Sequence, residues 1–337
     1  MSQKKVSVII PTYKRPEFLL RAIASVLYQD YENVEILVVD DNNDGDEFRK
    51  ETSSLMHRFA NNPKVKYLKH VKNSNGSAAR NTGIKNANGD YIAFLDDDDY
   101  FLPQRISYTV DFLENSSTDI GGCCVNYVKK YKEKIYKVSN YDCASNNCVK
   151  LLTASVDYGA GSTLMIKKEV LSEIGLFDTS YRRHQDWEFL IRVFRKYKIV
   201  NLPYLGVVIC ADGYRNSHNP QLAIDMKEKI FSDFSEDLLM LPKKQFEKIT
   251  KAQSLELIHT CLKARLYVKG LKINAFISKN FGRLKLNCYP QLILSAILGV
   301  CPSFMLLVYL VFDIKYRKYH TLVKSIESQY LDFYSNL

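Results

Sequence analysis

Apolar runs and polar, helix-like stretches alternate along the first hundred residues. Four short runs are rich in β-branched and other apolar residues, namely Val6–Ile10, Val34–Val39, Val65–Leu68 and Tyr91–Leu95. Runs of this length with polar flanks are typical of buried strands. We expect helices between them, near residues 16–28, 47–59 and 78–86. Strands that alternate with helices predict a mostly parallel sheet flanked by helices, in the α/β class.

Polar clusters follow directly on the ends of three of these predicted strands. Pro11-Thr12 follows the first strand, Asp40-Asp41 the second, and Asp96–Asp99 the fourth. Open α/β sheets bind their ligands at the carboxyl ends of the strands. Residues 1–103 are therefore expected to form a nucleotide-binding half-domain.

The pattern changes after this half-domain. Residues 104–220 mix helices with short strands, including a strand at Thr163–Ile166 and a helix over residues 184–197, and we expect them to form the second half of the same domain. Beyond Asn219 the pattern is helical and basic. We therefore expect residues 221–337 to form a separate helical region, and two such units fit a chain of 337 residues.

The basic charge is concentrated in the C-terminal region. The chain has a formal charge of +10, which admits nucleic acid, an acidic membrane surface or a small phosphorylated ligand as a partner. Between Lys243 and Lys324 the chain has 15 Lys and Arg residues against three acidic ones, a balance of +12. The rest of the chain therefore has a slight negative balance.

One long apolar stretch, Leu292–Phe312, lies inside this basic region. About 20 apolar residues suffice to span a bilayer, but Pro302 divides this stretch into two shorter pieces. A re-entrant or in-plane pair with basic flanks suits a peripheral enzyme on an anionic membrane surface. A buried hairpin is the alternative. We expect the C-terminal region to attach the protein peripherally to the membrane.

Two features indicate a cytoplasmic protein at the inner face of that membrane. The eight cysteines form no Cys-x-x-Cys pair, which favours reduced and mostly buried thiols. No signal peptide is expected, because only five apolar-leaning residues, Val6–Ile10, precede Pro11.

The run Asp96–Asp99 is the sharpest chemical feature of the sequence. Carboxylates about 4 Å apart repel one another by roughly 4 kcal/mol at an effective dielectric constant of 20. Such a cluster at a strand end favours a cation, and oxygen ligands suit Mg²⁺ or Mn²⁺, which bridge to phosphate oxygens. A solvated acidic turn is the alternative. The apolar strand before the run and Phe101–Pro103 after it favour a site.

The stretch Asn75–Gly83 offers a second phosphate-binding element. It can present helix N-terminal amides and Arg80 to a pyrophosphate, although it could also be a simple loop at the start of a helix. It contains neither a G-x-G-x-x-G nor a G-x-x-x-x-G-K motif, which disfavours the dinucleotide-binding and P-loop folds.

Taken together, these segments resemble glycosyltransferase family 2, whose members have the GT-A fold. The resemblance covers residues 5 to about 220. Its matching pieces, in order, are Val6–Arg15, Val38–Asp41, Asn75–Gly83, Gly89–Asp99, Gly161–Ile166, Gly175–Asp178 and Gln185–Glu188.

The resemblance implies a role for each matching position. Pro11, Thr12, Tyr13 and Arg15 would border the nucleotide-sugar, and Asp41 would hydrogen-bond the base, typically uracil. Arg80 would lie along the diphosphate, Asp96 would sit near the ribose, and Asp97 would be a further nucleotide-sugar-binding residue. In the D-x-D element Asp98 would ligate the metal, and Asp186 would be the general base for the acceptor hydroxyl.

Three positions qualify this assignment. Asp97 fills a place that the family commonly gives to a small residue, so the exact metal ligand within Asp96–Asp99 stays open, and Asp96 is a further candidate. His218 is another, although it could equally be an exposed loop histidine. Gln185 stands where the family often has a glutamate.

The function that follows is an inverting, metal-dependent glycosyltransferase. It would transfer a hexose or N-acetylhexosamine from a UDP-sugar to a saccharide, with Mn²⁺ or Mg²⁺ as cofactor. The acceptor would be linked to polyprenyl diphosphate, as in lipopolysaccharide O-antigen or capsule assembly.

Three other functions compete with this one. A processive polysaccharide synthase is disfavoured because the sequence has neither a Q-x-x-R-W element nor several spanning segments. A nucleic-acid-binding protein is disfavoured because the basic residues flank an apolar stretch, which suits lipid head groups better. A non-catalytic nucleotide-sugar-binding protein would retain donor binding without releasing UDP in the presence of acceptor.

Overall fold

The computed structural model describes residues 3–141, 144–153, 161–211, 219–281, 323–326 and 328–329. The chain forms two compact units. The first comprises residues 1–147, 158–214 and 313–337, and the second comprises residues 148–157 and 215–312.

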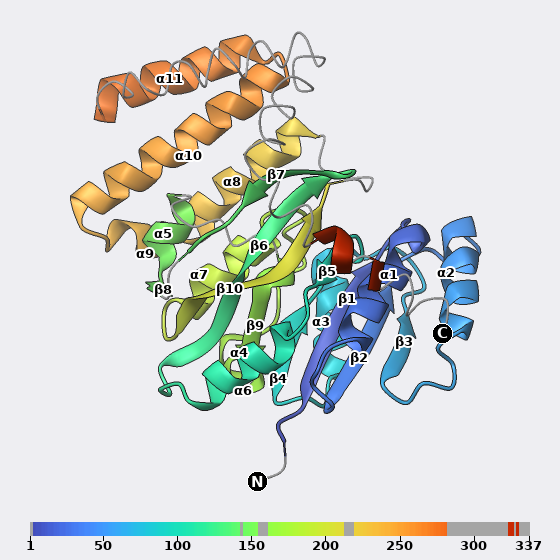
Figure 1. Ribbon diagram of the computed structural model, residues 1–337. Coiled ribbons are helices and arrows are strands. Elements are labelled where there is room, and N and C mark those ends of the chain that lie inside the picture. The colour runs from blue at the N-terminus through green and yellow to red at the C-terminus, as the bar shows by residue number, and fades with distance from the viewer. Residues whose placement is uncertain are drawn as a thin grey trace. The chain divides into compact units, whose positions relative to one another are not determined.

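The first unit is built on a sheet of ten strands whose main order is β3-β2-β1-β4-β9-β6-β10-β5 (Figure 1). Its first four strands in the sequence are β1 (Val6–Thr12), β2 (Val34–Asp40), β3 (Val65–Lys69) and β4 (Tyr91–Phe94). These strands are parallel to one another, as the alternating pattern predicts. Their carboxyl ends therefore meet at one edge of the sheet.

The expected end of the first strand at Ile10 was two residues too early. Strand β1 continues through Pro11 to Thr12, where Pro11 lies opposite Val39 of β2. On its other side, β4 ends opposite Ile9. Among the described strands, only β2 pairs with this extension, and the extension brings Thr12 beside Asp40 at the carboxyl edge of the parallel strands.

The other half of the sheet is mixed. Strand β9 (Leu164–Lys167) lies antiparallel to β4 and to β6 (Ile120–Tyr131), and β10 (Lys198–Cys210) runs parallel to β6. A single turn of 3₁₀ helix, η1 (Gly161–Thr163), leads into β9. The remaining strands each pair antiparallel with a neighbour and are β5 (Tyr100–Phe101), β7 (Lys134–Val138) and β8 (Ala144–Asn146).

Helices cover both faces of the parallel half. Side chains alternate between the two faces of a strand, so Val8 and Ile10 of β1 lie on one face and Ile9 on the other. Val8 and Ile10 share a buried cluster with Leu19 and Ile23 of α1 (Pro16–Leu27). On the Ile9 face, α3 (Gly76–Asn86) comes so close that a Cβ on Gly83 would lie 2.4 Å from the Ile9 side chain. The other helices of this unit are α2 (Glu47–His57), α4 (Arg105–Glu114), α6 (Lys168–Ile174) and α7 (Gln185–Val193).

The second unit is helical, as the pattern beyond Asn219 predicts. It contains α5 (Cys148–Leu152), α8 (Pro220–Asp233), α9 (Ser235–Leu239), α10 (Lys243–Lys263) and α11 (Tyr267–Phe281). Ile258 of α10 and Ile277 of α11 form the centre of a small apolar core. The buried Lys227 of α8 donates hydrogen bonds to Gln253 (2.7 Å) and Glu256 (2.6 Å) of α10, which ties these two helices together.

The structure describes only a short part of the chain beyond residue 281. Val323 and Ile326 pack with Tyr100 and Val208 in an apolar cluster of the first unit. The stretch Leu292–Phe312 lies outside the described residues. Within the described part of the chain, no helix is long and apolar enough to cross a membrane.

Candidate active site

Three carboxylates meet where β4 ends. One carboxyl oxygen from each of Asp96, Asp98 and Asp99 lies within 4.8 Å of the other two. Mg²⁺ binds oxygen at about 2.1 Å, so ligands on opposite sides of the ion are about 4.2 Å apart. The observed spacing and the all-oxygen donor set therefore fit Mg²⁺ or Mn²⁺ after a small adjustment. Asp98 and Asp96 were named from the sequence as candidate ligands, and Asp99 was included only as a member of the acidic run.

Arg15 pairs with Asp98 of this cluster and with the neighbouring Asp97. Its guanidinium lies 2.6 Å from an oxygen of Asp97 and 2.6 Å from an oxygen of Asp98. Burial raises the pKa of Asp97 to about 7, and the charge of Arg15 opposes that rise. Because the Asp97 side chain is completely buried, a direct contact with a donor would require it to move. Arg15 and Asp97 were both expected beside the nucleotide-sugar. They pair with each other next to the candidate metal site.

Ser162 fixes the fourth aspartate from the opposite side. Its hydroxyl donates to Asp99 Oδ2 (2.6 Å) and lies 3.1 Å from the amide of Asp96, which donates to it. The backbone amide of Cys210 donates to Asp99 Oδ1 (3.0 Å). Burial, followed by the charges of Asp98 and Asp96, holds the pKa of Asp99 well above its usual range. Gly161-Ser162 belongs to the family pattern, and that pattern gave the serine no role.

A buried arginine supports this serine. Arg105 is completely buried and lies over the Phe101 ring, with its guanidinium carbon 4.2 Å from the ring centre. Its guanidinium donates to the carbonyls of Thr163 (3.1 Å) and Leu164 (3.2 Å). These contacts hold η1 and the start of β9, the segment from which Ser162 reaches the aspartates.

Asp40 and Asp41, which end β2, have different surroundings. Asp40 pairs with Arg49 (3.0 Å) and accepts from Tyr67 (2.5 Å), so it is a structural group. Asp41 accepts from His70 Nδ1 (2.7 Å) and from the amide of Ser74 (2.7 Å). Burial raises the pKa of Asp41, and its bond to His70 opposes the rise.

The residues expected beside the nucleoside, which are Thr12, Tyr13 and Asp41, lie at the ends of β1 and β2. The amide of Asp41 donates to the carbonyl of Thr12 (2.9 Å), which joins the ends of β1 and β2. Pro11 and Tyr13 flank Thr12 and are partly exposed. His70 was missed by the sequence reasoning, although its position directly after β3 placed it at the same edge.

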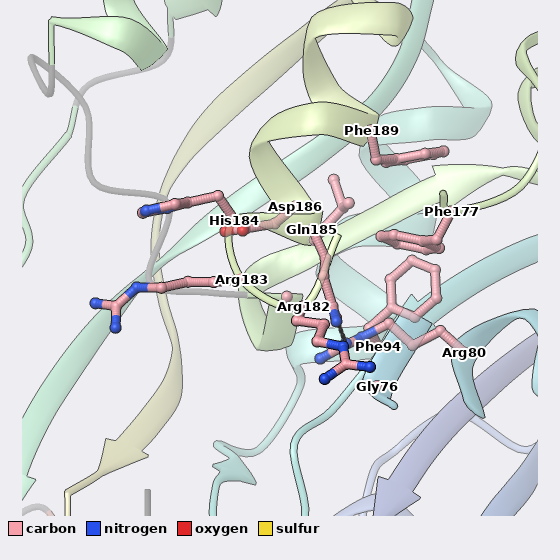
Figure 2. Close-up of a pocket in the computed structure, with 12 residues that line it drawn as sticks. Gly76, Arg80, Phe94, Phe177, Arg182, Arg183, His184, Gln185, Asp186 and Phe189 are labelled. Atoms are coloured by element: carbon pink, nitrogen blue, oxygen red, sulfur yellow. Dashed lines mark hydrogen bonds between the residues drawn. The ribbon is translucent and has the colours of Figure 1, made fainter. Parts of the chain in front are cut away.

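Arg80 connects three separate segments. It lies in α3, and its guanidinium donates to Asp96 (2.7 Å) and to Gln185 Oε1 (2.9 Å). The side chain of Asn75 caps the N-terminus of α3 by accepting from the amides of Ser77 and Ala78. The helix that carries Arg80 is therefore anchored beside both the aspartates and α7, and Figure 2 shows the bond to Gln185.

Asp186 lines a cavity next to Arg80 (Figure 2). The cavity has a volume of about 280 Å³. Its aromatic wall consists of Phe177, which stacks on Phe189 at 4.5 Å and meets Phe94 edge-on at 5.4 Å. Burial raises the pKa of Asp186, the charge of Arg80 lowers it, and Asp96 raises it. Asp186 is thus electrostatically linked to the carboxylates through Arg80.

Glu188, the other acidic residue in the first turn of α7, has a structural role. It is 4% exposed and pairs with Arg192, whose guanidinium also donates to the carbonyls of Ile174 and Leu176 (both 2.7 Å). The cavity is not lined by Glu188. Of the two acids, Asp186 is therefore the one that faces the cavity. His218, a candidate metal ligand, lies outside the described residues.

The comparisons with known proteins agree with this arrangement. The family model described as "Glycosyl transferase family 2" matches residues 7–175, half of the chain. The chain belongs to glycosyltransferase family 2, as the ordered motifs predicted.

Two curated relatives share the N-terminal part of the chain. An uncharacterized glycosyltransferase of Rickettsia conorii is 43% identical over 117 residues, which cover 35% of this chain and 18% of that protein. The putative colanic acid biosynthesis glycosyl transferase WcaA of Escherichia coli is 38% identical over 103 residues, which cover 30% of this chain and 35% of that protein. The matched part thus spans less than half of either relative.

Solved structures confirm the fold. S. aureus TarS in complex with UDP-GlcNAc aligns with a TM-score of 0.53 at 15% identity, covering 85% of this chain and 92% of that chain. The sheet of the first unit is thus the GT-A fold that the sequence predicted.

The buried ion pair of Glu188 with Arg192 yields a prediction about stability. Arg192→Met would leave the buried Glu188 carboxylate without its partner and should lower the free energy of unfolding by about 3 kcal/mol. Urea unfolding measures this change. Lys196→Met, which breaks the exposed pair with Glu173, is the matched control and should have little effect. An Arg192→Met variant as stable as the wild type would show that the pair does not hold α7.

Proposed function

We propose that this chain is an inverting glycosyltransferase that transfers a hexose or N-acetylhexosamine from a UDP-sugar to a saccharide hydroxyl. The observation that carries the proposal is the connection of Asp96 to α7 through Arg80, which sets a carboxylate cluster beside a cavity lined by Asp186. A donor diphosphate and an acceptor hydroxyl need these two kinds of group next to each other.

Thr12, Tyr13 and Asp41 would bind the nucleoside at the ends of β1 and β2. The Asp41 carboxylate is an acceptor, which suits the N–H edge of uracil, and His70 holds it in place. The UDP-GlcNAc complex of TarS, which has the same fold, supports a UDP-sugar donor.

The diphosphate would lie between Arg80 and the carboxylate cluster. A divalent cation held by Asp98, with Asp96 and Asp99, would neutralise charge on the diphosphate as UDP leaves. Arg80 contributes its own charge at the same place and is already held there by Asp96 and Gln185.

Asp186 would act as the general base. Its carboxylate takes the proton from the acceptor hydroxyl while the acceptor oxygen bonds to the anomeric carbon and the bond to the diphosphate oxygen breaks. Attack from the face opposite the leaving UDP inverts the anomeric configuration. The aromatic wall around Phe177 keeps water from competing with the acceptor.

The acceptor would be a saccharide linked to polyprenyl diphosphate in surface polysaccharide assembly, such as O-antigen or capsule. The similarity to WcaA, whose name assigns it to colanic acid biosynthesis, supports this pathway class. A lipid-linked acceptor places the enzyme at the inner face of the cell membrane. Helix α11 fits such a surface because it carries Lys269, Lys272 and no acidic residue, with Val268 and Leu271 exposed.

The carboxylate cluster predicts metal dependence. EDTA should abolish transfer, Mn²⁺ or Mg²⁺ should restore it, and Asp98→Asn should remove most of the activity because it removes a charged ligand. Transfer assays with and without added metal measure this. Glu114→Gln, on α4 outside the cluster, is the control and should keep its metal response. Full activity in EDTA would exclude the metal site.

The position of Asp186 predicts a loss of turnover without a loss of donor affinity. Asp186→Asn should lower kcat by about 10²–10⁴-fold and leave the Kd for UDP unchanged, because a positioned base contributes about that factor. In the wild type, kcat should fall as the pH falls through the raised pKa of Asp186, since only the ionised carboxylate accepts a proton. Steady-state kinetics, calorimetry and a thermal melt separate these effects. Wild-type turnover by the variant would remove Asp186 from the mechanism.

The basic face of α11 predicts binding to anionic membranes. The chain should sediment with vesicles that contain phosphatidylglycerol and much less with phosphatidylcholine alone, and added salt should release it. Lys269→Glu with Lys272→Glu should weaken this binding by at least tenfold. Lys50→Glu, an exposed lysine of α2, is the control. Equal binding to neutral vesicles would contradict an electrostatic attachment.

A further inference from the structure

His70 is held at every one of its polar groups. It follows β3 directly, and its amide donates to the carbonyl of Asp40 (2.9 Å), while its own carbonyl accepts from Arg49 (2.7 Å). In the side chain, Nδ1 lies 2.7 Å from Asp41 Oδ1, and Nε2 lies 2.8 Å from the hydroxyl of Thr82. A histidine that is bonded at both backbone groups and at both ring nitrogens has little freedom to move.

The bond between His70 and Asp41 runs from the histidine to the carboxylate. Asp41 also accepts from the amide of Ser74 (2.7 Å) and from Asn73 Nδ2 (2.7 Å), so donors reach both of its oxygens. The ionised carboxylate is the form that only accepts. His70 therefore donates through Nδ1, and Nε2 either accepts from or donates to the hydroxyl of Thr82. Burial raises the pKa of Asp41, and the bond from His70 opposes the rise.

These donors hold the Asp41 carboxylate in one orientation at the edge where the nucleoside is proposed to bind. The Asp41 side chain is 4% exposed, so a ligand reaches only a small part of it. Uracil offers such an acceptor its N3–H. Cytosine has a lone pair at N3, which a carboxylate repels, and its amino group is attached to the next ring atom. A carboxylate that cannot shift toward that amino group rejects cytosine, because specificity follows from unfavourable contacts with the wrong ligand.

We propose that His70 is a positioning residue that makes the nucleotide site select uracil over cytosine, by holding the Asp41 carboxylate opposite N3 of the base. The inference rests on the proposed UDP-sugar-dependent function and names the residue that sets the choice of base. The same side chain also reaches α3 at Thr82, two residues beyond Arg80. The base site and the arginine proposed to bind the diphosphate are therefore connected through one helix.

Two amide variants separate the roles of the two ring nitrogens. In His70→Asn the amide nitrogen can take the place of Nδ1 and donate to Asp41. In His70→Gln the longer side chain brings the amide nitrogen to the place of Nε2, beside Thr82. Calorimetry with UDP and with CDP, each in the presence of Mg²⁺, gives the ratio of their affinities. Because the two nucleotides share the ribose and the diphosphate, this ratio depends on the base alone.

The wild type should bind UDP at least about tenfold more tightly than CDP, since the wrong base leaves a charged acceptor unpaired. His70→Gln should reduce this preference by roughly tenfold, as expected for the loss of a hydrogen bond to a charged group. His70→Asn should retain most of it. Thr82→Val removes the partner of Nε2 and should lower the melting temperature without changing the ratio. His57→Asn, at an exposed histidine of α2, is the matched control and should change neither.

The tautomer of His70 gives a test that needs no variant. In the wild-type complex with UDP, Nδ1 should carry a hydrogen, which the ¹⁵N chemical shifts of the histidine ring report. A bare Nδ1 in that complex would overturn the inference, because the bond to Asp41 would then not be donated by His70.

The variants can overturn the inference in three further ways. These are equal binding of UDP and CDP by the wild type, a preference that survives in folded His70→Gln, and a loss of the preference in Thr82→Val as large as that in His70→Gln. The last result would make His70 a tie between β3 and α3 only. A wild type that binds neither nucleotide would instead refute the proposed function, and this inference with it.

Discussion

Four neighbouring carboxylates at the end of β4 repel one another, and the site is organised by the groups that offset this repulsion. Arg15 pairs with two of them, Arg80 with a third, and Ser162 with the Cys210 amide holds the fourth. These partners come from the loop between β1 and α1, from η1, from the last residue of β10 and from α3. Stabilising one short acidic run therefore fixes the relative positions of four segments of the GT-A fold, including both halves of the sheet.

The sequence predicted the parallel half of the fold well. The strands were placed to within two residues at each end. Strands β1, β2 and β4 are buried along almost their whole length, and strands buried on both faces leave continuous apolar runs. The order of the polar clusters then indicated which edge of the sheet binds ligand. Arg80, Asp96 and Asp186 were named from the family pattern, and in the structure Arg80 bonds Asp96 and Gln185, the residue directly before Asp186.

The remaining features of the site could not be predicted, because they depend on a turn and on long-range contacts that the alternation of apolar and polar residues does not reveal. Alternation along an extended chain groups Asp96 with Asp98 and separates Asp99 from them. The chain turns here instead, with the Asp99 amide bonded to the Asp96 carbonyl (3.0 Å), and this turn brings the third carboxylate to the cluster. Arg15 reaches Asp98 across 83 positions of sequence, so periodicity could not reveal the pair.

The pairing of Arg15 with the buried Asp97 constrains how this region can change in evolution. Losing one member of a buried ion pair leaves the other charge uncompensated, whereas replacing both by apolar residues of similar volume can be neutral or stabilising. Single substitutions at either position therefore lie in a fitness valley, and the two positions can be exchanged only together. Arg15 also contacts Asp98, so replacing Arg15 and Asp97 together would also change the charge beside the candidate metal site. The pair thus couples the evolution of a core position to that of the carboxylate cluster.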